Sequence, residues 1–144
     1  MENSDTLCLL KECNSGSKMA VSSLDEVSDK VCNSDMKALL EKSREHHVKL
    51  GNEIHALLTR HQSMEQEPPL MAKGMSWLKT NVKMSLDESD SSIADLLTDG
   101  CSMGIKSLHR YLNQYGDADE DSKKICKKLI SIEEELYRDL CEYL

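Results

Sequence analysis

Cysteine and histidine are the residue types of this sequence that could bind a metal or act as nucleophiles. The chain has six cysteines and five histidines, and no two cysteines are spaced as Cys-x-x-Cys. This spacing argues against a zinc ribbon and a thioredoxin-type redox site. No cysteine or serine has a recognisable base and orienting group around it, and no glycine-rich loop is placed to hold phosphate. The sequence therefore does not indicate nucleophilic catalysis.

His47 is the histidine at the centre of an apolar helical stripe. The stripe follows a three-four alternation through Met36, Leu40, Ser43, His47, Leu50, Ile54, Leu57 and His61. We interpret His47 as a buried, hydrogen-bonded core residue, with a ligand role as the alternative. Its expected partners are Ser43, one turn away, and Asn14 or Ser17 from a neighbouring helix.

Gly100 and Gly104 lie four residues apart in the middle of another helical pattern. Two glycines in a helix cost roughly 1.6 to 2 kcal/mol relative to alanine, so we expect a gain that offsets this cost. Close helix packing is the leading interpretation, and a small ligand cavity is the alternative. We therefore expect Gly104→Leu to overpack the core and to destabilise the fold more than Gly116→Ala. Gly116 is expected to end the helix as its C′ residue.

The elements that must position these residues are helices. Apolar periodicity and capping residues predict helices over about 5–31, 35–62, 70–84, 90–115 and 120–143. Pro68 and Pro69 break the chain before the short helix, which carries Met71, Met75 and Trp77 on one side. That helix is expected to cross over the bundle, and its stripe could instead bind a partner.

Composition and charge restrict the class of protein. The 144 residues fit a single domain, 1–144, and an aromatic content of 3% without phenylalanine favours an all-α fold. A net charge of −8 argues against nucleic acid and anionic membranes as partners. The N-terminal residues resemble no signal peptide, so we expect a cytoplasmic protein.

Matched helix lengths predict a four-helix bundle made of two antiparallel hairpins joined by a long crossover. This is the ferritin-like arrangement. The segments HVKLGNEIHALL, MAKGMSWLKTNVK, DGCSMGIKSLHRYLNQY and LISIEEELYRDLCEYL also resemble a small bacterial branch of ferritin-like proteins of unknown function.

The ferritin-like superfamily is known for a di-metal site built from inward glutamates and Glu-x-x-His pairs. This pattern fails here, because Arg44 stands three residues before His47 and no histidine follows Glu133, Glu134 or Glu135 at that spacing. We therefore expect no metal and no cofactor. His47, Glu53 and Glu133 are the weak candidates for atypical ligands of iron or manganese.

Two functions remain open at this stage. We favour a non-catalytic, ferritin-like bundle that acts as a self-associating binding or structural protein. The alternative is a di-metal carboxylate protein of ferroxidase or peroxidase type. We expect a homo-oligomer, first of all a dimer, because the first helix has a wide apolar arc that includes Leu9, Cys13, Met19 and Ala20.

Overall fold

The computed structural model describes residues 4–61 and 89–144, and their secondary structure is entirely helical. The elements are α1 (Ser4–Ser28), α2 (Ser34–Arg60), α5 (Asp90–Gln114), α6 (Glu120–Leu140) and the short 3₁₀ helix η1 (Cys141–Tyr143). The all-α prediction and the four long helices are confirmed. The first helix ends three residues earlier than expected, at Ser28, and the last ends in a 3₁₀ turn.

Side-chain caps explain where three of the helices begin. Asn33, Ser89 and Asp119 each accept a hydrogen bond from a backbone N–H three residues later, at Met36, Ser92 and Ser122. Helix α5 ends at Gln114 with Tyr115 as its C-cap residue, so Gly116 occupies the predicted C′ position, although its φ is not in the left-handed region.

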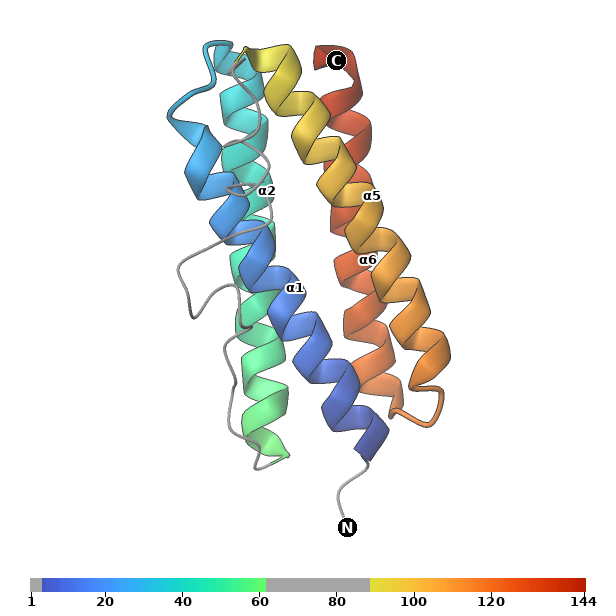
Figure 1. The fold of residues 1–144 in the computed structure, drawn as a ribbon. Helices are drawn as coiled ribbons and strands as arrows, with labels where there is room; N and C mark the ends of the chain where they lie inside the picture. The colour runs from blue at the N-terminus through green and yellow to red at the C-terminus, as the bar shows by residue number, and fades with distance from the viewer. Residues whose placement is uncertain (1–3, 62–88) are drawn as a thin grey trace.

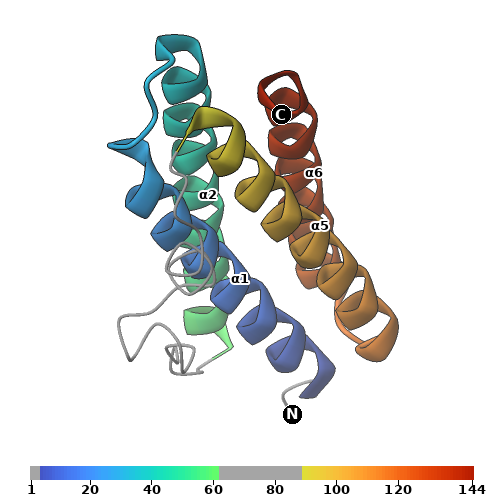
Figure 2. The same cartoon turned by 45° about the horizontal axis from the view of Figure 1, so that its top comes forward.

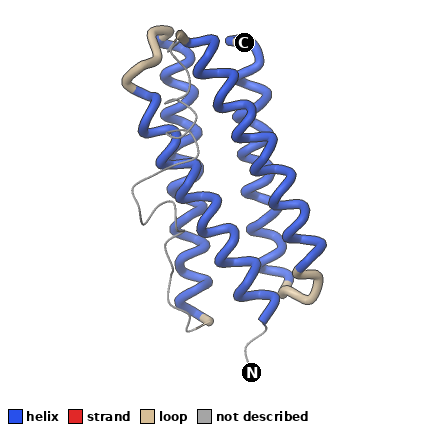
Figure 3. The backbone as a smooth tube through the Cα atoms, in the orientation of Figure 1, coloured by secondary structure: helices blue, strands red, loops and turns tan. Residues whose placement is uncertain are grey.

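The helices form two antiparallel hairpins, α1–α2 and α5–α6, that lie side by side (Figure 1). Their short loops are at opposite ends of the bundle, so α2 and α5 run in the same direction (Figure 3). Helix α6 contacts both α1 and α2, whereas α1 and α5 contact one another less than the two helices of either hairpin do. The expected crossover helix at 70–84, with Met71, Met75 and Trp77, lies outside the described residues. Within the described ranges, no helix has the length and apolar character needed to span a bilayer.

The interior is divided into two apolar clusters by a polar layer. One cluster lies towards the α5–α6 loop and includes Leu9, Ile54 and Leu129. The other lies towards the α1–α2 loop and includes Leu24, Leu40, Ile93, Leu97 and Leu140. Buried polar residues lie between them in sequence on α1, α2 and α6, namely Asn14, Ser17, Ser23, Ser43, His47 and Glu133. The chemistry of this molecule is therefore concentrated at mid-bundle.

Helices α1 and α5 are held together at both ends by side chains that bind loop backbone. Asp90, in the first turn of α5, accepts hydrogen bonds from the N–H groups of Cys32 (2.8 Å) and Asn33 (2.9 Å). At the other end, Asp5 and Thr6 in the first turn of α1 accept hydrogen bonds from the N–H groups of Asp117 (3.0 Å) and Asp119 (2.8 Å), respectively. Figure 2 shows these two helices crossing the same face of the bundle.

The wide apolar arc of α1 is largely used within the chain itself. Leu9 and Cys13 are fully buried in the first apolar cluster. Met19 and Ala20 are partly exposed and line a cavity between α1, α5 and α6. The arc therefore no longer argues for a contact with a second copy of the chain.

Candidate functional site

The centre of the polar layer is a buried pair, His47 on α2 and Glu133 on α6. Nε2 of His47 is 2.8 Å from Oε1 of Glu133, although the two residues are 86 positions apart in sequence. The histidine is 0% exposed and the glutamate 8%. The interpretation of His47 as a buried, hydrogen-bonded core residue is confirmed, and so is its contact with Ser43. The expected partners on α1 are wrong, because the hydroxyl of Ser17 donates to the backbone oxygen of Asn14 and the cross-bundle partner is Glu133.

The contact of Nδ1 of His47 determines which ring nitrogen carries a hydrogen when the ring is neutral. Nδ1 of His47 is 2.8 Å from the carbonyl oxygen of Ser43, which can only accept, so Nδ1 carries a hydrogen. Nε2 then faces the carboxylate of Glu133 and carries the second hydrogen when the ring is charged. Burial disfavours the charged imidazole, but the hydrogen bond and charge of Glu133 outweigh it and raise the pKa of His47.

Cys101 on α5 is the third chemical group at this position. The residue is 3% exposed and lies near Glu133. Burial and the nearby negative charge both raise the pKa of Cys101, so the sulfur stays protonated at neutral pH. It therefore lacks the thiolate that a nucleophile needs.

Glu133 also lines a cavity of about 340 Å³ between α1, α5 and α6. Much of the wall is made of small residues, which are too short to fill the space between the helices. They are Ser15, Gly16, Ala20, Ser23, Gly100, Gly104 and Ser107. Leucines and methionines, including Met19 and Met103, complete it. The charged residues in its lining are Glu12 and Glu133, and no cationic side chain from the described residues reaches it.

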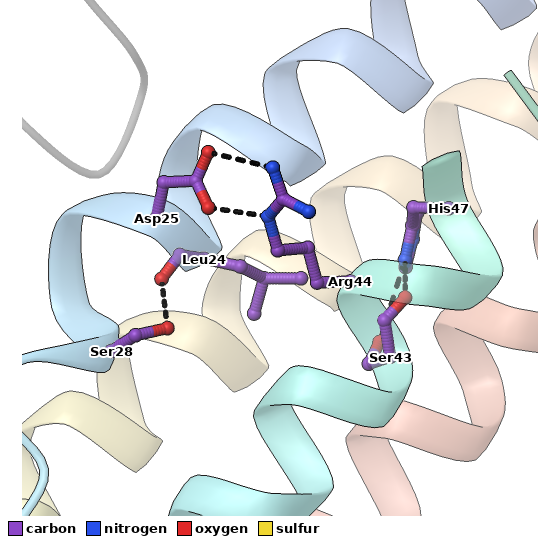
Figure 4. Close-up of polar contacts among 6 residues, drawn as sticks. All are labelled: Leu24, Asp25, Ser28, Ser43, Arg44 and His47. Atoms are coloured by element: carbon purple, nitrogen blue, oxygen red, sulfur yellow. Dashed lines mark hydrogen bonds and ion pairs between the residues drawn. The ribbon is translucent and has the colours of Figure 1, made fainter. Parts of the chain in front are cut away.

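A second hollow lies on the other side of the pair, between α1 and α2. It is more open, with a volume of about 830 Å³, and His47 lies in its wall. Its lining carries both signs of charge, from Lys18, Asp25 and Glu26. Beside it, Arg44 binds the carboxylate of Asp25 through Nε (2.5 Å) and Nη2 (3.4 Å), as Figure 4 shows together with the Ser43–His47 contact. Arg44 thus joins α2 to α1 at the surface of the bundle.

The glycines have different surroundings from those expected. A Cβ atom at Gly104 would have Glu133 atoms as its nearest neighbours, at 4.0 Å, which is an ordinary contact. Gly100 and Gly104 therefore line the cavity, and the predicted close helix packing at Gly104 is wrong. The close approach occurs at Gly51 on α2, where a Cβ would lie 3.3 Å from Oγ of Ser17. Sequence reasoning did not single out Gly51, although its place next to the apolar stripe of α2, one turn after His47, was a usable signal.

The weak metal candidates are only partly brought together. His47 and Glu133 are in contact, whereas Glu53 is on the exposed face of α2. Across residues 4–61 and 89–144, no group of three or more histidine, cysteine or acidic side chains is arranged to hold a metal ion. Nothing in this geometry favours the di-metal alternative. That the protein carries no metal stays a prediction, which elemental analysis of protein purified without chelators would test.

Comparison with known proteins adds no further information about this site. The chain matches no protein-family model, no curated protein and no solved structure.

Proposed function

We propose that this protein is a non-catalytic binding protein whose cavity between α1, α5 and α6 holds a small ligand with an apolar body. The observation that carries this proposal is the cavity itself. Its volume of about 340 Å³ falls within the usual range for small-molecule sites, which is about 300 to 1,000 Å³. Its lining is apolar except for a few polar groups, and this combination is typical of such sites.

The protonation of the buried groups supports binding over catalysis. Both ring nitrogens of His47 are engaged, one with Ser43 and the other with Glu133, so neither is free to take a proton from a ligand. The raised pKa of Cys101 keeps the thiol neutral. A bound molecule would therefore meet hydrogen-bonding groups but no activated base or nucleophile.

The experiment that tests this proposal uses 4-phenylbutan-1-ol as a neutral probe. Met19 and Met103 line the cavity, so the NMR signals of their methyl groups report on its contents. We expect saturable shifts of these two signals in the parent protein and their loss in Gly104→Leu, whose new side chain fills the space. Gly116→Leu is the matched control, because Gly116 is exposed in the α5–α6 loop. No saturable shift in the parent, or equal binding by Gly104→Leu, would overturn the proposal.

We further infer a ferritin-like, cytoplasmic bundle. The parallel direction of α2 and α5, the helices on either side of the long connection, supports the ferritin-like arrangement. Self-association as a dimer stays a prediction. The apolar arc of α1 no longer supports it, because that arc is largely used within the chain. Light scattering at high micromolar concentration tests it, and a monomer would contradict it.

A further inference from the structure

The charges around the α1/α5/α6 cavity all have one sign. Glu133 lies in its wall at the level of the polar layer, and Glu12 on α1 is the second carboxylate. Glu12 lies near Tyr111 on α5, another lining residue, and raises the pKa of its phenol. An apolar space bordered by two carboxylates and an aromatic ring has the composition that receives organic cations.

Glu133 is oriented to serve both His47 and the cavity. Oε1 contacts Nε2 of His47 at 2.8 Å, whereas Oε2 lies 4.0 Å from the Cβ position of Gly104. The missing side chain at position 104 therefore leaves Oε2 open to the cavity. Since the carboxylate is about nine-tenths buried, a hydrogen bond to a cation is screened little by water.

We propose that the ligand of this cavity is a small monocationic amphiphile, an amine with an apolar body, whose ammonium group binds Oε2 of Glu133. This inference rests on the proposed function and names the chemical class of its ligand. A space of about 340 Å³ is the size of such a molecule and too small for a helix, which is about 10 Å wide with its side chains. The ligand is therefore a free amine and not a lysine presented by a partner helix.

Binding of the amine is linked to the proton on His47. When His47 is charged, an incoming ammonium would place two cations against one carboxylate, so the imidazole releases its proton as the amine binds. Other charged or titratable groups also line the two hollows. They are Glu12, Tyr111 and Cys101 in the cavity, and Lys18, Asp25, Glu26 and His55 in the α1/α2 hollow. Unlike these groups, His47 contacts the carboxylate of Glu133 directly, through Nε2.

The test compares three probes that differ only in their polar end: 4-phenylbutylamine, 4-phenylbutan-1-ol and 4-phenylbutyrate. In the parent protein we expect the amine to bind about tenfold more tightly than the alcohol, and the carboxylate to bind most weakly. Calorimetry in buffers of different ionisation enthalpy that contain no primary amine should show proton release with the amine and none with the alcohol. Equal affinities for amine and alcohol would overturn the inference.

Glu133→Gln is the decisive variant, because it keeps the shape and a hydrogen bond to His47 but removes the charge. We expect it to bind amine and alcohol equally, and an undiminished preference for the amine would overturn the inference. If this variant does not fold, proton release by the parent decides, and its absence with the amine would be contrary evidence. Binding of the alcohol without any charge preference overturns only this inference. Failure of both amine and alcohol to shift Met19 and Met103 overturns the proposed function itself.

Discussion

The two hollows beside the His47–Glu133 pair differ in how their helices meet. In the α1/α2 hollow the helices approach closely at Gly51, and Arg44 and Asp25 join them at the surface. In the α1/α5/α6 cavity the helices stay apart, and small residues such as Gly104 leave the space unfilled. Mid-helix glycine therefore has two opposite uses in this bundle. It brings α1 and α2 together at one site and leaves a cavity unfilled at the other.

The largest effect on stability is expected from removing the His47–Glu133 contact, which lies between the two hollows. Glu133→Ala leaves His47 buried without its partner, and we expect the free energy of unfolding to fall by about 3 kcal/mol. Urea denaturation measures this change. The double variant His47→Leu/Glu133→Leu should recover most of the loss, because no unpaired polar group remains. A loss well below 1 kcal/mol in Glu133→Ala would show that the pair does not support the layer.

Placing leucine at Gly51 and at Gly104 compares the close helix contact with the open cavity. Gly51→Leu must displace Ser17, so we expect a loss of about 2 kcal/mol in the free energy of unfolding. Gly104→Leu enters the cavity and gains helix propensity, so we expect a change of no more than about 1 kcal/mol. Thermal and urea denaturation of both variants decide the point. If Gly104→Leu were the less stable of the two, the assignment of tight and open sides would be reversed.

The smallest effect is the dependence of stability on pH. The pKa of His47 is raised by Glu133 against the effect of burial, so the pair stabilises the fold fully below about pH 6.5. This contribution is lost as pH rises through the raised pKa. In Glu133→Gln the charge of Glu133 is gone and burial outweighs the hydrogen bond to Ser43, so stability should instead fall as pH drops below about 6.5. Urea denaturation of both proteins between pH 6 and 9 should therefore show their difference narrowing. Parallel curves would mean that His47 is uncharged throughout.

Sequence periodicity predicted the helices well because each apolar stripe repeats locally. The caps at Asn33 and Asp119 are equally local, since each bonds to a backbone N–H three residues away. The burial of His47 also followed from its place in the stripe of α2. These features depend on a few consecutive turns and not on how the helices are assembled.

The His47–Glu133 contact could not be predicted in the same way. It depends on the relative height of α2 and α6, and three consecutive glutamates, Glu133 to Glu135, offer similar carboxylates at that height. The roles of Gly51 and Gly104 have the same origin. Whether a helical glycine faces a close neighbour or a cavity is decided by the opposing helix, here Ser17 for the first and Glu133 for the second.

The hydrogen bonds at the two ends of α1 and α5 have a consequence for the energetics of binding. Asp90 at one end and Asp5 with Thr6 at the other fix the spacing of these helices independently of what lies between them. The cavity is then already formed before a ligand arrives, and little backbone or side-chain entropy is lost when one enters. The affinity of the cavity for a ligand would then come from preorganisation, because the loss of backbone and side-chain entropy occurs when the protein folds.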